Sequence, residues 1–309
     1  MLRRTLLAAS RSDRLEQLSR SMPVARDVVT RYVAGETVED AVGVAATLDD
    51  AGLAVSLDHL GEDVHDDGQA EATVKHYVDL LRRLSDAGLT KSTEVSVKLS
   101  ALGQALGADG EKAAQDRAAR ICETARSVGT TVTLDMEDHT TVDSTLGVLS
   151  ELRTTFPDVG AVIQAQLRRS AADCGALSYA GSRVRLCKGA YSAPESVAYP
   201  SGHEVDRSYV RCLAALMAGG CYPMVATHDP RLIEIARALA ALSDRADDSF
   251  EYQMLYGVRP QEQRRLAHSG GRMRVYVPYG DQWYQYMVRR LAERPANVGF
   301  FLRSLMSRT

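Results

Sequence analysis

The sequence has few cysteines, no long apolar run and no basic tract, and each absence removes a class of protein. Its five cysteines are an odd number, are scattered and form no Cys-x-x-Cys pair. This pattern argues against a disulfide framework or a thiolate metal site and suits a reducing cytosol. The net charge of −3 comes without a cluster of lysine and arginine, so we do not expect a nucleic-acid partner.

The N-terminus carries too short an apolar stretch for a secretory leader. Residues 1–7 read Met-Leu-Arg-Arg-Thr-Leu-Leu, and no segment of membrane-spanning length follows them. We therefore expect a soluble, cytoplasmic protein. Residues 1–14 hold too few leucines to argue for more than peripheral contact with the inner face of the membrane.

Eight short apolar runs alternate with helical stretches through most of the chain. The expected strands cover 53–57, 94–99, 131–134, 161–166, 183–187, 222–226, 250–255 and 273–277. The helical stretches between them cover 70–86, 112–127, 141–155, 169–180, 205–217, 230–243 and 260–269. This alternation predicts a parallel sheet with right-handed crossovers.

A (β/α)₈ barrel is the predicted α/β architecture. An open doubly wound sheet normally carries a glycine-rich phosphate loop after its first strand, and no G-x-G-x-x-G stands in this chain. We expect a single domain over 1–309, in which a helical lead-in (1–50, with helices over 15–35 and 37–50) precedes a catalytic barrel over 51–300.

Polar side chains end all eight expected strands. They are Asp58, Lys98, Asp135, Gln164, Gln166, Arg185, Lys188, Thr227, His228, Gln253 and Tyr276. Active sites of barrels lie at the carboxyl ends of the strands, so this mixture of charges and hydrogen-bonding groups predicts a lined cavity there. Asp135 is a plausible partner for Lys98 or for an arginine of the last helix.

Two further clusters are candidate binding sites. The neighbouring residues Glu137, Asp138 and His139 resemble metal ligands, but adjacent residues rarely converge on one ion and no second histidine stands at ligand spacing, so we expect no metal site. The stretch Arg185–Tyr191 places two cations on what we expect to be one strand face, beside Gly189. That arrangement suits an anion or a phosphate.

The stretch Arg274–Gly280, in which the last strand ends in an expected turn, leads into an expected helix over 281–294. On this helix Tyr286, Arg289, Arg290 and Glu293 stand at i, i+3, i+4 and i+7 and share one face. Two neighbouring arginines at a strand mouth form a fork that can clamp a planar carboxylate.

Together these motifs resemble the proline dehydrogenase family of flavin enzymes. The matching pieces are Val95–Ser100, Asp135–Asp138, Gln164–Ala165, Arg185–Tyr191, Ala226–His228, Phe250–Gly257, Tyr276–Gly280 and the set Arg289-Arg290-x-x-Glu293. They occur in the family's order and cover about 50 to 300. The resemblance implies a distorted (β/α)₈ TIM-like barrel whose last helix lies above the mouth.

The resemblance also implies an activity and a set of site residues. The implied reaction is oxidation of L-proline to Δ1-pyrroline-5-carboxylate with non-covalent FAD, a quinone as electron acceptor and a separate pyrroline-5-carboxylate dehydrogenase for the product. The residues implied at the reaction centre are Lys98, Asp135, Tyr276, Arg289 and Arg290. Those implied to contact substrate are Lys98, Leu186, Tyr191, Leu255, Tyr276, Tyr286, Arg289, Arg290 and Glu293. Those implied to hold the flavin are Gln164, Arg185, Lys188, Ala190, Thr227 and His228.

Two positions refine this comparison, and two alternatives stay open. Ser192 replaces a tryptophan of the bifunctional relatives, and Tyr276 stands where relatives that prefer hydroxyproline have a small residue, which favours proline. One alternative is a barrel lyase or aldolase that forms a Schiff base at Lys98 or Lys188. The other is a non-catalytic barrel that binds flavin or an amino acid.

Overall fold

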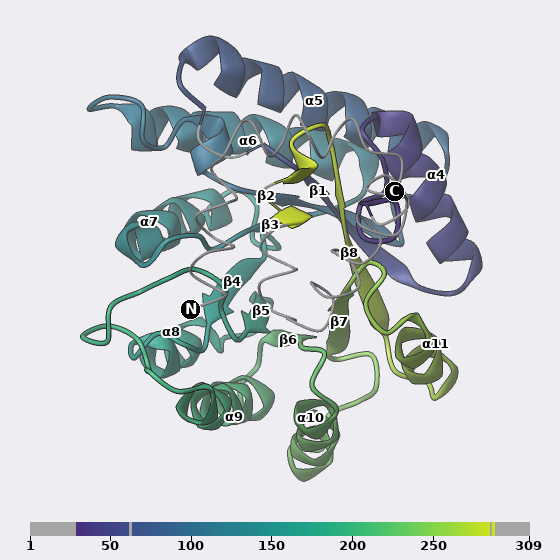
Figure 1. Ribbon diagram of the computed structural model, residues 1–309, viewed down its shortest axis with the longest axis vertical. Helices are drawn as coiled ribbons and strands as arrows, with labels where there is room; N and C mark the ends of the chain where they lie inside the picture. The colour runs from purple at the N-terminus through teal and green to yellow at the C-terminus, as the bar shows by residue number, and fades with distance from the viewer. Residues whose placement is uncertain (1–28, 62–63, 285, 288–309) are drawn as a thin grey trace, which may run out of the picture.

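Eight parallel strands form one curved sheet in the computed structural model, which describes residues 29–61, 64–284 and 286–287. The sheet order is β3-β2-β1-β8-β7-β6-β5-β4. The strands are β1 (Ala54–His59), β2 (Thr93–Val97), β3 (Val132–Leu134), β4 (Ala161–Gln164), β5 (Arg183–Cys187), β6 (Tyr222–Ala226), β7 (Glu251–Leu255) and β8 (Met273–Tyr279). Helices lie around the outside of the strands (Figure 1).

The sheet curls into a nearly closed barrel, which confirms the predicted fold. The first and last strands pair in parallel, with Leu57 opposite Val277. At the other side, the two edge strands β3 and β4 are joined through Gly160, whose carbonyl accepts from Leu134 N at 2.9 Å and whose amide donates to Val132 O at 2.8 Å. A Cβ at Gly160 would collide with Thr133 Oγ1, so this junction requires glycine.

The helices follow the strands as the sequence predicts. They are α4 (Val38–Asp50), α5 (Asp67–Asp86), α6 (Gly110–Val128), α7 (Val142–Arg153), α8 (Ser170–Leu177), α9 (Gly202–Ala218), α10 (Pro230–Leu242) and α11 (Pro260–His268), with short 3₁₀ turns η1 (Ser100–Leu102) and η2 (His139–Thr141). Local chemistry fixes their starts. Thr37 and Asp40 form a capping box on α4, and Asp229 caps α10 immediately before Pro230.

Side chains alternate strictly between the two faces of each strand. Outward positions such as Val95 and Val97 are fully buried in the core between the strands and the helices. Inward positions are unusually polar, as with Glu94 and Ser96 on the same strand. Barrel interiors are mostly filled by branched apolar residues. The charged interior of this barrel therefore points to a binding or catalytic site inside it.

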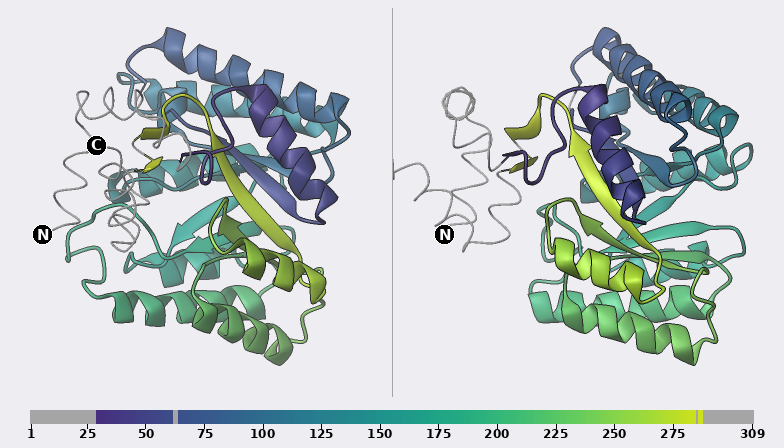
Figure 2. Two further views of the ribbon diagram at one scale, coloured as in Figure 1. Left: turned by 45° about the vertical axis from the view of Figure 1, so that its right-hand side comes forward. Right: turned by 90° about the vertical axis from the view of Figure 1, so that its right-hand side faces the viewer.

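The segment before α4 lies against the carboxyl ends of the last strands. Ala34 N donates to Pro278 O and Gly280 N donates to Gly35 O, both at 2.9 Å. The helix α4 then runs beside β8 (Figure 2). The first helix predicted, over 15–35, lies largely outside the described residues, as does most of the last, over 281–294. Among the described helices, none is long and apolar enough to cross a membrane.

Candidate functional site

Arg185, on the inward face of β5, lies at the centre of the barrel interior. Its side chain is only 5% exposed, and each of its five N–H groups has an acceptor. The acceptors are Gln253 Oε1 at 2.6 Å from Nε, Ser96 Oγ at 2.8 Å and Asp135 Oδ1 at 2.7 Å from one terminal nitrogen, and Ser56 Oγ at 3.1 Å and Glu94 Oε1 at 3.0 Å from the other. The guanidinium is therefore held in one orientation.

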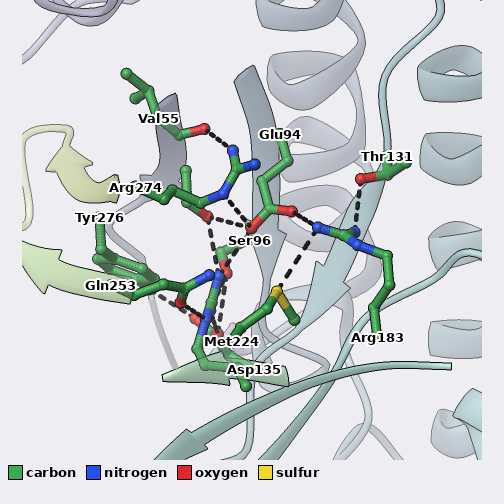
Figure 3. A network of polar contacts seen from close by, with 12 residues as sticks. Val55, Glu94, Ser96, Thr131, Asp135, Arg183, Met224, Gln253, Arg274 and Tyr276 are labelled. Atoms are coloured by element: carbon green, nitrogen blue, oxygen red, sulfur yellow. Dashed lines mark hydrogen bonds and ion pairs between the residues drawn. The ribbon is translucent and has the colours of Figure 1, made fainter. Parts of the chain in front are cut away.

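Asp135, just after β3, collects donors from three other strands. Besides Arg185, it accepts hydrogen bonds from Ser96 Oγ at 2.9 Å and from the phenol of Tyr276 at 2.6 Å. The ring of Tyr276 lies over the guanidinium of Arg185, with 5.2 Å between the guanidinium carbon and the ring centroid. Figure 3 shows Tyr276, Asp135 and Ser96 converging in this network.

Lys98, just after β2, completes the group from the side of β1. Its ammonium donates to Asp58 Oδ1 at 2.6 Å and lies 3.6 Å from Asp135 Oδ2. The side chains of Lys98 and Asp58 are 9% and 2% exposed. An ammonium held between two carboxylates is not a free amine nucleophile, and this argues against a Schiff base at Lys98.

Burial raises the pKa of two groups in this site. It raises the pKa of Asp58 to about 6, because desolvation and the Asp135 charge outweigh the attraction of Lys98. Burial, followed by the Asp135 and Asp58 charges, also raises the pKa of Tyr276 well above its usual range. The phenol is therefore neutral at physiological pH and can act as the donor to Asp135.

The residues expected to hold a flavin end the neighbouring strands β4, β5 and β6. Gln164 Nε2 donates to Glu137 O at 2.7 Å, and Thr227 Oγ1 accepts from Asp229 N at 3.1 Å. His228 Nε2 accepts from Leu255 N at 2.9 Å, which leaves any ring proton of the neutral imidazole on Nδ1. Their strands are adjacent, so these groups line one side of the mouth.

Comparison with known proteins gives the family. The family model described as proline dehydrogenase matches residues 41–303. The chain belongs to the proline dehydrogenase family.

Similar proteins agree along the whole chain. A proline dehydrogenase of Deinococcus radiodurans is 37% identical over 99% of this chain and 98% of its own length. Proline dehydrogenase 1 of Bacillus subtilis is 34% identical over 100% of both.

A solved structure shares the fold. Proline utilization A (PutA) from Bdellovibrio bacteriovorus, inactivated by N-propargylglycine, has a TM-score of 0.80 and 26% identity over 86% of this chain. The match covers 32% of that chain, so this protein spans about a third of its length.

The sequence predicted part of the site's pairing. Lys98 does lie near Asp135, as expected. Among the described residues, the arginine that pairs with Asp135 is Arg185 of β5, which lies two strands along the barrel from β3. The arginines of the last helix lie outside the described residues, so their pairing with Asp135 stays a prediction. Predicting Arg185 and Lys188 on one strand face was wrong. Lys188 follows the end of β5, and its ammonium pairs with Asp206 at 2.6 Å and Asp229 at 3.2 Å, where α9 and α10 meet.

The residues expected around a substrate ring are only partly brought together. Leu255 occupies an inward position at the end of β7, beside Tyr276 in the middle of β8. Leu186 is on the opposite face of β5 from Arg185. It is fully buried in the outer core, and its carbonyl accepts from Tyr209 of α9 at 3.1 Å. The structure thus contradicts a substrate contact by the Leu186 side chain. The carbonyl of Tyr191 accepts from Gln166 Nε2 at 2.9 Å.

The expected carboxylate clamp falls mostly beyond the described residues. Arg289, Arg290 and Glu293 lie outside them, and Tyr286 is the described member of that helix face. Tyr286 is 6% exposed and belongs to an apolar cluster with Leu60, Trp283 and two valines of the N-terminal segment.

Several residues of the network had no role in the sequence prediction. Asp58 was expected only as a polar strand end, and Glu94, Glu251 and Arg274 were not singled out. A usable signal was present, since these charges occupy the same alternating positions as Ser96 and Arg185 on strands with apolar outward neighbours. Over the described residues, no group of three or more histidine, cysteine or acidic side chains is arranged to hold a metal.

Proposed function

We propose that this chain oxidises L-proline to Δ1-pyrroline-5-carboxylate, the first step of proline catabolism. The observation that carries the proposal is the Arg185–Asp135–Tyr276 cluster at the carboxyl ends of the strands, with Lys98 beside it, in a member of the proline dehydrogenase family. The runner-up functions have no comparable support. Lys98 is ion-paired, and a purely binding barrel gives no reason for so many buried charges.

FAD is the cofactor proposed, and the donors at the mouth fit it. Gln164 offers an amide, and Lys188, 36% exposed, offers a cation near the start of α10. Thr227, His228 and the backbone of Ala190 complete the set proposed to bind the cofactor. Amides, hydroxyls and cations suit a flavin's carbonyl oxygens and its pyrophosphate. Arg185 already has an acceptor for every N–H, so we propose that it acts on the flavin through its charge.

The substrate would be held by charge at one end and by apolar contact at the other. In the proposed arrangement Lys98, Arg289 and Arg290 bind the carboxylate, while Tyr276 and Leu255 face the ring. Bound FAD would supply the acceptor for the hydride that leaves the carbon next to nitrogen, and a quinone would take its electrons. The chain's own residues position the substrate and exclude water, since Lys98 and Asp135 are both nearly buried.

The proposed partners follow from this reaction. The product is a cyclic imine carboxylate, which we expect a separate pyrroline-5-carboxylate dehydrogenase to consume. The quinone acceptor is the reason to propose peripheral contact with a membrane surface.

Turnover with a chemical trap for the product tests the proposal. Purified protein supplied with FAD, L-proline and an artificial electron acceptor should reduce the acceptor and form an imine that reacts with o-aminobenzaldehyde. Other amino acids should be poor substrates. Borohydride trapping of substrate on the protein, without flavin reduction, would instead favour the Schiff-base lyase.

Tyr276→Ser is expected to change the choice of substrate. The phenol lies against Asp135 and Arg185, where a hydroxyl on the substrate ring would meet it, so the smaller side chain should raise turnover of hydroxyproline relative to proline. Tyr276→Phe is the matched control. It keeps the ring and loses one hydrogen bond, so kcat/KM should fall about fivefold, equivalent to ~1 kcal/mol, with an unchanged ratio. An unchanged ratio in Tyr276→Ser would show that Tyr276 does not face the substrate ring.

Asp58 is expected to make stability depend on pH. Its folded-state pKa of about 6 lies above the ordinary 3.8, so the folded protein binds the proton more tightly and the Asp58 contribution to stability falls as pH rises from about 4 through 6. Asp58→Asn resembles the protonated form. The free energy of unfolding of this variant should equal that of the native chain near pH 4. Above pH 6 it should be higher than that of the native chain by up to about 3 kcal/mol.

Urea unfolding of the two proteins at pH 5 and pH 7.5 measures this difference. Between these two conditions the gap in unfolding free energy should widen by about 1 to 1.5 kcal/mol. A gap that stays constant would show that the buried carboxylate titrates with its usual pKa.

A further inference from the structure

Glu94, at the start of β2, lies beneath Arg185 on the side away from the mouth. It is 1% exposed. One of its oxygens accepts from Arg185 at 3.0 Å and from Ser56 Oγ at 3.0 Å, and the other accepts from Arg183 at 2.5 Å. The guanidinium of Arg274 lies 3.9 Å away. Figure 3 shows Glu94 between Arg274 and Arg183.

Arg185 is therefore held between two carboxylates at different depths. Asp135 contacts it from the mouth of the barrel, and Glu94 contacts it from the floor. A third support comes through Gln253, whose Oε1 accepts from Arg185 while its Nε2 donates to Glu251 at 2.6 Å. The Glu251 carboxylate in turn accepts hydrogen bonds from Nε and a terminal nitrogen of Arg274, at 2.7 and 3.2 Å.

The charges along the barrel axis balance. The carboxylates are Asp58, Glu94, Asp135 and Glu251, and the cations are Lys98, Arg183, Arg185 and Arg274. Burial raises the pKa of Glu94, but the guanidiniums of Arg274, Arg183 and Arg185 outweigh burial and leave it well below its usual range. Glu94 is thus a permanent negative charge, and the reason for its position lies in what it does to Arg185.

We propose that Glu94 is a positioning residue that fixes the guanidinium of Arg185. Its negative charge also reduces the positive electrostatic potential that Arg185 produces at the ligand in the mouth of the barrel. The inference rests on the proposed flavin-dependent function and adds a residue to it that does not touch the ligand. Positive charge near a flavin stabilises its reduced, anionic form and raises its midpoint potential. A counter-charge below Arg185 lowers that potential.

Glu94→Gln tests the inference. It keeps the size of the side chain and removes its charge, so the interior holds one more cation than anion. We expect a more positive midpoint potential for the bound flavin. Sulfite, which adds to the oxidised flavin and binds more tightly as the potential rises, should show at least a fivefold lower Kd. A potential and a sulfite Kd equal to those of the native protein would overturn the inference.

Two further variants separate charge from packing. Arg183→Gln removes a cation that competes with Arg185 for Glu94, at a position 15% exposed, and should shift the potential in the negative direction. Glu234→Gln, an exposed glutamate of α10, should change nothing. Should Glu94→Gln fail to fold, the sign of the shift in Arg183→Gln decides alone, and a positive shift or none would contradict the inference.

The proposed function is checked in the same samples. Native protein whose flavin is not reduced by proline would count against the proposed function and leave the role of Glu94 measurable by potential and sulfite. Native protein that is reduced by proline, with a Glu94→Gln potential that does not move, would count against the Glu94 role alone.

Discussion

Asp135→Asn is expected to lower kcat/KM for proline by at least about a hundredfold, equivalent to roughly 3 kcal/mol of lost interaction. Both carboxylate oxygens are occupied, one by Arg185 and Ser96 and the other by Tyr276. An asparagine amide keeps one acceptor and turns an N–H toward donors on the other side. Arg185 and Tyr276 would then lose the carboxylate that accepts hydrogen bonds from both of them.

The same substitution should also lower the free energy of unfolding by about 3 kcal/mol or more, because it removes one partner from a buried charge network. Steady-state kinetics and urea unfolding measure the two effects. Asp143→Asn is the matched control, since Asp143 is 87% exposed and pairs with Arg169 on the surface. It should change either quantity by less than about 0.5 kcal/mol. An Asp135→Asn enzyme with native kcat/KM would remove Asp135 from the site.

Arg185→Lys is expected to be nearly as damaging although it preserves the charge. A lysine has three donors on one atom and cannot reach five acceptors from four strands at once. Gln253, Glu94 and Asp135 would compete for one ammonium, and at least one buried carboxylate would lose its partner. We expect a loss of about 3 to 5 kcal/mol in unfolding free energy and a fall in kcat of at least tenfold.

Arg120→Lys provides the comparison for that variant. Arg120 is 53% exposed and binds Glu71 at the surface, where exchange of arginine for lysine costs less than about 1 kcal/mol. If Arg185→Lys lowered the free energy of unfolding and kcat no more than Arg120→Lys does, the five hydrogen bonds of Arg185 would not matter to fold or activity.

The barrel was predictable because each strand carries its own evidence. Alternating apolar residues and polar ends marked all eight strands, and their observed limits differ from the expected ones by one or two residues in most cases. Two strands, β1 and β8, extend two residues past their expected ends, and β8 continues through Pro278 to Tyr279. A turn was expected after Val277, but Pro278 continues the pairing with β1 and its carbonyl accepts from Ala34 N.

The pairing across the barrel was not predictable in the same way. Alternation says that Arg185 and Asp135 both face inward, but the distance between them depends on how tightly eight strands close. The sequence therefore left Lys98 and the last helix as equal candidates for Asp135. The prediction for Leu186 failed for a related reason. Its family motif is contiguous with Arg185, yet neighbours along a strand point to opposite faces.

The buried floor shows a second limit of sequence reasoning. Glu94 and Arg274 look like ordinary charged residues at the starts of strands, where exposure is the usual expectation. Glu94 is buried because it supplies the counter-charge for Arg183 and Arg185 and lies near Arg274, and Arg274 is buried because it pairs with Glu251. Only the assembled barrel brings these charges of β2, β5, β7 and β8 into contact, and the order of residues along the chain does not reveal it.

The visible spectrum of the purified protein, before and after anaerobic addition of L-proline, tests the central claim most directly. The claim is that the charged interior of this barrel serves a flavin that accepts a hydride from proline. We predict a yellow protein whose flavin absorbance is bleached by proline in the absence of oxygen and restored by a quinone. A protein that stays colourless after FAD is supplied, or that binds FAD without bleaching, would contradict it.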